Sequence, residues 1–342
     1  MPSSGRTYGV YAVKDDIKEY LAAESYKVSD DNLLLKFCMD ASRLFDSDCS
    51  RPSRARWFYP LRKTLTLDHP GEDYFTPAPP PNVNAPTDIR QAAHLNLKTD
   101  VLEVEQLVTQ NGITTVAAAD YYLTRGSDRN ARPYDTINLN PTGAQKVFNW
   151  TGTPLGANTV TGIYGYHEMW EGAFVELDTV QAAALTVGAT QVQVADADGV
   201  DEYGIEGRFK VQQLLRIGDG ESYEFAYLTG VNNSTNILTL IRAVNGTVEL
   251  EHAIGTKIYV YRPLADIVQA IKVLAVHSYR RRPNIGNTND RIVATPTGTL
   301  LIPNKKPVEY EEAVKRYRVP KPIITAYGNE GLTDWQWKEI AG

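Results

Sequence analysis

The chain has 342 residues, of which 42% are hydrophobic and 22% are charged, and its formal net charge is -6. This composition is typical of a globular protein with room for two domains, or for one domain that carries a large insertion. The longest apolar runs are far shorter than the roughly 18 residues of a membrane-spanning helix, and the first residues do not resemble a signal peptide. An acidic chain is also a poor candidate for general DNA coating.

Two helices are predicted near the N-terminus. Residues 13–23 place Ile17, Tyr20 and Leu21 on one face at helical spacing. A longer helix begins after the N-cap candidate Ser29 and ends before Pro52. Its apolar stripe should pack against another element, and it consists of Leu34, Phe37, Cys38, Ala41, Leu44 and Phe45.

The cysteines indicate neither a disulfide nor a zinc site. Within one helix, the rise per residue would separate Cys38 and Cys49 by about 16 Å, whereas a disulfide needs alpha carbons within about 7 Å. No CxxC pair occurs, and the five histidines are scattered singly. We therefore predict two reduced thiols, with Cys38 in the core.

A basic and aromatic segment follows the long helix, with the sequence RARWFYPLRKTLTLDHP over residues 54–70. Arginines interleaved with aromatic rings can clamp single-stranded nucleic acid. Alternatively, a structural strand would turn its aromatic side chains to the core and its arginines to water or to a neighbouring subunit. We favour the structural interpretation. The basic residues concerned are Arg51, Arg54, Arg56, Arg62 and Lys63.

The middle of the chain is expected to be rich in strands. The proline-rich residues 76–88 predict an exposed loop. After it, short β runs alternate with turn signals, which indicates antiparallel meanders. These runs cover residues 92–110, 114–125, 134–140, 145–150 and 158–170. Residues 178–262 then show β runs without any helical period, including one at 184–188, and predict a self-contained β module of hairpins.

A helix is predicted directly after this module, which indicates that the module interrupts a domain. The helix follows Pro263 and carries one apolar face, made of Ile267, Ile271, Leu274, Ala275 and Ser278. A candidate hairpin over residues 290–303, a short helix and a polar tail with Trp335 and Trp337 complete the chain. These tryptophans are expected to dock, either on their own domain or on a partner.

Together these elements predict an α+β fold in three parts. The first is a small core of about three helices with antiparallel strands, formed by residues 1–177 and 263–283. The second is an inserted all-β hairpin or barrel-like module at 178–262, and the third is an extended C-terminal arm at 284–342 that docks onto a partner.

Motifs for catalysis are missing from the sequence. It contains no GxxxxGK[ST], GxGxxG, HExxH or GxSxG motif, and the glycines of IGDGESYEF suit a hairpin turn. The run DADGVDEYG at 196–204 starts like a calcium loop but lacks flanking helices. We therefore predict a protein that is not an enzyme and that uses no metal or cofactor.

Several stretches, taken in order, resemble the head–tail connector proteins of tailed bacteriophages, also called adaptors or head completion proteins. They are LLLKFCMDASRLFDSDCSRPSRARWFYP, AADYYLTRGSDRNARPYDTINL, VTGIYGYHEMW and PLADIVQAIKVLAVHSYRRRP, and the helix running into Phe58, Tyr59 and Pro60 is typical of the family. Residues 205–262 are similar to a β module inserted in phage structural proteins. The resemblance covers residues 10–283, and the shortest family members lack the insertion.

The resemblance implies a structural protein of the virion neck, present in the host cytoplasm during assembly. It implies a homo-oligomeric ring of about twelve copies beneath the portal protein, which extends the DNA channel and gives the tail a platform. The partners would be the portal, tail-completion or stopper and tail-tube proteins, and double-stranded DNA that passes without specific binding. The expected contacts to the portal or neighbouring subunits are Arg280, Arg281, Arg282, Tyr317, Trp335 and Trp337.

Two other hypotheses stay open. A phage tail or surface-binding structural protein would use exposed aromatic side chains of the β module, namely Tyr223, Phe225, Tyr227, Tyr259 and Tyr261. A hydrolase would need Asp or Glu pairs that the sequence alone does not bring together.

Overall fold

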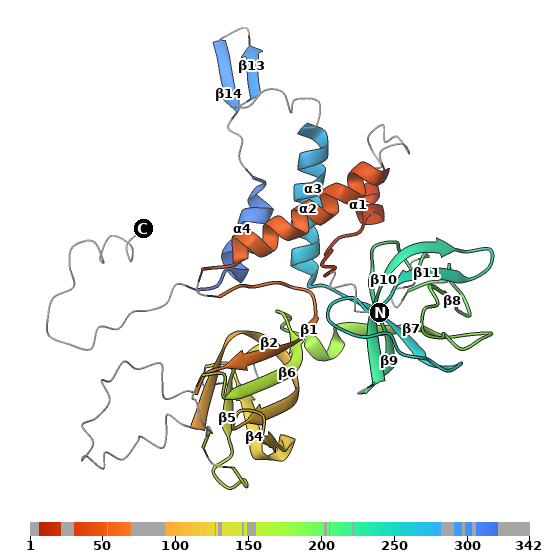
Figure 1. Cartoon of the computed structure of the whole chain (residues 1–342). Coiled ribbons are helices and arrows are strands. Elements are labelled where there is room, and N and C mark those ends of the chain that lie inside the picture. The colour runs from red at the N-terminus through yellow and green to blue at the C-terminus, as the bar shows by residue number, and fades with distance from the viewer. Residues whose placement is uncertain are drawn as a thin grey trace, which may run out of the picture.

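A computed structural model describes residues 7–21, 31–69, 93–281, 291–302 and 306–320, apart from residues 53, 127, 129–131, 146, 149–154, 202–203, 205, 221 and 296–297. Four helices, two six-stranded antiparallel sheets and a two-stranded hairpin are formed by these residues. Figure 1 shows the helices, the first sheet and the second sheet as three neighbouring units. The expected α+β fold is confirmed. None of the described helices is long and apolar enough to span a membrane.

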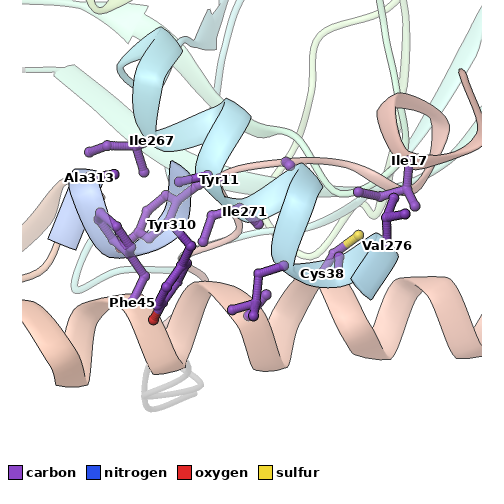
Figure 2. Close-up of a cluster of buried hydrophobic side chains, with 14 of the residues drawn as sticks. Tyr11, Ile17, Cys38, Phe45, Ile267, Ile271, Val276, Tyr310 and Ala313 are labelled. Atoms are coloured by element: carbon purple, nitrogen blue, oxygen red, sulfur yellow. The ribbon is translucent and has the colours of Figure 1, made fainter. Parts of the chain in front are cut away.

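The helical unit consists of α1 (Lys14–Leu21), α2 (Asp31–Cys49), α3 (Ala265–Arg281) and α4 (Val308–Tyr317). Figure 2 shows apolar side chains from all four helices meeting above α2. The stripe predicted on α2 is buried at Leu34, Cys38, Ala41 and Phe45. Leu44 was predicted to join it, but its side chain is 39% exposed at the edge of the buried face.

Helix α4 lies within the expected C-terminal arm, yet it packs in the helical core. Its side chains at spacings of three and four, Tyr310, Ala313 and Tyr317, are buried on one face. Asp48 of α2 accepts hydrogen bonds from Lys306 Nζ and from the hydroxyl of Tyr310, at 2.5 and 2.8 Å. Lys306 and helix α4 are therefore attached to α2.

The first sheet is built from β1 (Leu61–Leu67), β2 (His94–Thr109), β3 (Thr114–Val116), β4 (Tyr121–Thr124), β5 (Tyr134–Leu139) and β6 (Asn158–Tyr164). The strand order is β1-β6-β2-β5-β4, with β3 also paired to β2. The long strand β2 pairs with β3, β5 and β6, and its register against β5 shifts between Asn96 and Val101. A strand was also expected over 145–150, but the described residues there are irregular, and Phe148 is buried without pairing.

The second sheet is built from β7 (Phe174–Thr179), β8 (Gln191–Gln193), β9 (Leu214–Asp219), β10 (Ser222–Asn232), β11 (Ile237–Ile241) and β12 (Lys257–Tyr261). Its order is β7-β12-β9-β10-β11-β8, and it begins a few residues before the expected boundary at 178. A strand was expected at 184–188, but only Leu185 bridges to His252 there.

The two edge strands of the second sheet are connected by a side chain. The carboxylate of Asp178, in β7, accepts hydrogen bonds from the backbone amides of Ala195 and Asp196, each at 3.0 Å, just after β8. Gln181 N also donates to Gln193 O at 2.8 Å. Arg208 Nη1 lies 3.5 Å from the same carboxylate. These contacts connect the two edges of the second sheet.

A hairpin of β13 (Arg291–Thr295) and β14 (Gly298–Ile302) forms where the sequence predicts one. Within the described part of the chain, these two strands pair only with each other. Figure 1 shows them beyond the end of α3, away from the two larger sheets. The expected loop at 76–88 lies outside the described residues.

Candidate interaction surfaces

A buried charged cluster lies where the helices meet the first sheet. Asp100 of β2 binds Arg56 Nε at 2.8 Å and Arg54 Nη2 at 2.5 Å, and Arg56 also donates to the carbonyl oxygen of Tyr317 at 2.5 Å. The side chains of Arg56 and Asp100 are 5% and 3% exposed. We call Arg54, Arg56, Asp100 and the Tyr317 carbonyl the Asp100 cluster. It connects the segment after α2, strand β2 and the end of α4.

The arginines of this segment were expected to face water or a neighbouring subunit, and for Arg56 that prediction is wrong. Its guanidinium turns inward because Asp100 supplies a buried carboxylate. It also lies 4.3 Å from the ring centre of Tyr166, which Arg125 approaches to 5.3 Å. Phe58 is buried. This arrangement matches the structural interpretation of the segment and leaves Arg56 unavailable for a nucleic-acid clamp.

Tyr317 was expected at a partner interface, and this prediction is also wrong. Its side chain is buried in the helical core, and its hydroxyl donates to Asp266 Oδ2 of α3 at 2.6 Å. Burial and the neighbouring carboxylate of Asp266 both raise the pKa of the Tyr317 phenol. The residue therefore connects α4 to α3.

The other expected contact residues are only partly described. Arg280 is exposed near the end of α3, and Arg281 is the last residue of that helix. Arg282, Trp335 and Trp337 lie outside the described residues. Of the three expected contact residues that the structure describes, only Arg280 and Arg281 lie together, at the end of α3.

The aromatic side chains of the β module do not form an exposed row. Phe225, Tyr227, Tyr259 and Tyr261 are all buried, and the hydroxyl of Tyr223 donates to Glu105 of the first sheet at 2.6 Å. The expectation that these rings are exposed is wrong because most of them line the seam between the two sheets. The apolar cluster of this seam is formed by Leu102, Ile163, Trp170, Ala173, Leu214, Phe225, Tyr227, Val244 and Tyr261.

Asn245 completes this seam with its side chain. It accepts from Tyr8 N at 2.7 Å and donates to the carbonyl oxygens of Tyr8 and Pro60 at 3.1 and 3.0 Å. Next to it, Gly246 has φ +80°, and a Cβ there would lie 1.8 Å from the carbonyl oxygen of Arg62. Only glycine fits this close approach of the β module to β1.

Asp46 of α2 forms a buried hydrogen-bond network with Tyr11 and the backbone of Phe58. Tyr11 donates its hydroxyl hydrogen to Asp46 Oδ1 at 2.6 Å, while its oxygen accepts from Phe58 N at 2.9 Å. Burial raises the pKa of both side chains. A hollow of about 490 Å³ is lined by Asp46, Arg43, Tyr59 and residues 7–10. No nucleophile with an adjacent base lines it, so it offers no evident catalytic arrangement.

No metal-binding group stands out in the described residues, where no three His, Cys, Asp or Glu side chains gather as ligands would. In the calcium-like run, Asp196 instead accepts from Gly199 N at 2.9 Å and lies 3.6 Å from Arg208 Nη2. Cys38 and Cys49 are free and buried, and burial raises each pKa to about 12. These thiols are therefore unreactive at neutral pH.

Comparisons with known proteins give no relative: no protein-family model, no curated protein and no solved structure matches the chain. Two features were missed by sequence reasoning, namely Asp100 and Asn245. The available signals were an acidic residue inside a β run for Asp100 and an Asn-Gly turn for Asn245.

Proposed function

We propose that the chain is a structural head–tail connector of a tailed bacteriophage, without catalytic activity. In this role it forms a ring below the portal protein, extends the DNA channel and provides a platform for the tail in the virion neck. The ordered motifs over residues 10–283 support the proposal, together with one structural observation. The three units are joined by buried, mutually specific contacts.

A connector has to keep its parts in fixed orientation while other proteins assemble on both sides. Domains joined by small polar interfaces usually move relative to one another. Here the Asp100 cluster joins the helices to the first sheet, and the seam with Asn245 joins the first sheet to the β module. Lys14 N additionally donates to Gln212 Oε1 at 2.9 Å, from α1 to the β module. These connections favour a scaffold over an enzyme with moving domains.

The hairpin β13–β14 supports the expected partner contacts of the arm. An isolated two-stranded hairpin is marginally stable in water, and this hairpin pairs with neither larger sheet. We expect this hairpin and the residues after Val319 to contact the portal or a tail-completion protein. The net charge of -6 fits a channel through which DNA passes without being held.

The alternative, a surface-binding tail protein, would need exposed aromatic side chains on the β module. Its aromatic row is buried in the seam and in the module, so it cannot present rings to a glycan. A hydrolase has no support in the described residues, because their buried carboxylates each bind a structural partner.

The test is binding to the portal protein encoded in the same genome. The full chain and a deletion of residues 320–342 are each co-sedimented with intact portal rings. We expect the deletion to weaken binding at least tenfold, about 1.4 kcal/mol. The fold should persist, because the described contacts of α4 end with Val319, whose amide donates to Cys49 O at 2.9 Å. Absence of binding by the full chain would contradict the proposal, and undiminished binding by the deletion would contradict the role of the arm.

A further inference from the structure

Two loops of the β module present a group of exposed apolar side chains. Val187, Val248 and Ile254 are 64%, 57% and 58% exposed. The loops lie side by side, because Leu185 and His252 exchange backbone hydrogen bonds of 2.8 and 3.1 Å. Further exposed residues of the same loops are Ala182, Ala183, Ala184 and Ala253. We call the exposed residues of loops 181–190 and 246–256 the tip surface.

A buried ion pair holds these two loops from beneath. Arg242 Nε binds Glu224 Oε1 at 2.6 Å, and the two side chains are 1% and 0% exposed. Arg242 also donates to the carbonyl oxygens of Thr186, in the first loop, and Leu250, in the second. Glu224 Oε2 accepts from Leu250 N at 3.1 Å. We call this group the Glu224 cluster. Because the loops are already ordered, a partner would bind with a small loss of conformational entropy.

The tip surface also carries negative charge. Glu249 accepts a hydrogen bond from Gly188 N at 2.8 Å, and Glu251 is exposed. Neither carboxylate forms an ion pair with any residue in the described part of the chain. An apolar surface with free carboxylates is suited to a protein surface that is apolar and carries free cations.

The outer face of α2 has these complementary properties. Leu44, the residue that leaves the predicted core stripe, is 39% exposed. Lys36 and Arg43 are exposed on the same helix, with Asp40 between them, so the face has a charge of about +1. Neither cation has an ion-pair partner among the described residues. Leu44 and its cations therefore offer an apolar contact with opposite charge.

We propose that the tip surface of one copy docks on the outer face of α2 of a second copy, head to tail. The two surfaces lie in different units of the fold, so each copy keeps one of each free for a further neighbour. Such a heterologous contact closes into a ring when the rotation allows it, and otherwise extends into a filament. The contact between two copies is inferred from the tip surface and the outer face of α2. Only the closure of such contacts into a ring rests on the proposed function.

The first test uses cross-linking between two variants of the full chain, each with one added surface cysteine. The native Cys38 and Cys49 are buried and free, with each pKa raised to about 12, so they do not compete for a thiol reagent. Val248→Cys and Leu44→Cys are mixed with a short bismaleimide. The control replaces Val248→Cys by Val200→Cys, which is 48% exposed on another loop of the module. We expect about tenfold more cross-linked pairs from Val248→Cys. Equal yields would overturn the proposal.

The second test exchanges the charges in the same cross-linking pairs. Glu251→Lys, placed on the copy with Val248→Cys, should reduce the yield about tenfold, and Arg43→Glu on the copy with Leu44→Cys should restore it. Failure of the restoration would contradict the assigned pairing. Portal co-sedimentation of the Arg43→Glu chain separates the two proposals. Portal binding without tip-to-α2 cross-linking would overturn only this inference, whereas cross-linking without portal binding would overturn only the proposed function.

Discussion

The Asp100 cluster and the Glu224 cluster use the same chemistry for different purposes. Each is a buried arginine–carboxylate pair whose guanidinium also binds backbone carbonyl oxygens. The Asp100 cluster connects elements that are far apart in sequence and belong to two units. The Glu224 cluster stays within the β module and orders two neighbouring surface loops. One pair therefore fixes the arrangement of units, whereas the other fixes the shape of a surface.

Removing the carboxylate of the Asp100 cluster should have the largest effect. Asp100→Asn leaves Arg56 buried without its counter-charge, and breaking such a pair typically costs about 3–5 kcal/mol. We expect a loss of this size in the free energy of unfolding, measured by urea denaturation. Hydrogen exchange should increase both in β2 and at the end of α4. The matched control is Lys257→Gln, which removes an exposed ion pair with Glu176 and should leave the unfolding midpoint unchanged.

Removing the charge of the Glu224 cluster should be costly but local. The glutamine of Glu224→Gln can still accept a hydrogen bond, so we expect the free energy of unfolding to fall by about 3 kcal/mol. Hydrogen exchange should increase at the amides of Leu250 and Leu185, while the end of α4 stays protected. Equal loosening of α4 and of the loops would contradict the distinction between the two clusters.

The seam between the sheets can be tested with two glycines. Gly246 and Gly255 both have positive φ, +80° and +86°, but only at Gly246 would a Cβ meet backbone, at Arg62. Alanine at Gly255 should cost about 1–2 kcal/mol through backbone strain alone. Alanine at Gly246 should cost a further 1–3 kcal/mol, roughly, because β1 has to move. Equal unfolding free energies of the two variants would show that the close approach is unimportant.

The smallest effect concerns pH. Burial raises the pKa of Asp46 in the folded chain, so the folded state binds more protons than the unfolded state above the ordinary carboxyl pKa of about 4. Stability from this group is therefore present at low pH and is lost as pH rises toward the raised pKa. Asp46→Asn should reduce the decline of unfolding free energy as pH rises above about 4. Parallel pH profiles of the two chains, measured by urea denaturation, would contradict this assignment.

Periodic patterns in the sequence predicted much of the fold. Most of the helical stripe of α2 and of the apolar face of α3 is buried as expected, because spacings of three and four residues report a single buried face. The hairpin at Gly218 and Gly220 also forms, since these positions have φ +97° and +58°. In contrast, residues 145–150 have the composition of a β run, but Phe148 is buried without strand pairing, and a buried irregular segment gives the same apolar signal as a strand.

The contact surfaces were harder to predict, because they depend on which units meet. Arg56 and Tyr317 have residue types common at interfaces, and only the position of Asp100 and Asp266 in space shows that they are used internally. The aromatic residues of the module gave the same ambiguity, since an exposed row and a buried seam share one composition. Leu44 was expected to be buried and is instead 39% exposed. The spacing of apolar residues on a helix does not show where its buried face ends.

The most direct measurement is electron microscopy of the full chain mixed with its own portal protein. The connector proposal predicts a closed ring stacked coaxially on the portal, with the tip surface of each copy against α2 of the next. A monomeric chain beside intact portal rings, at concentrations well above those of assembly, would contradict it.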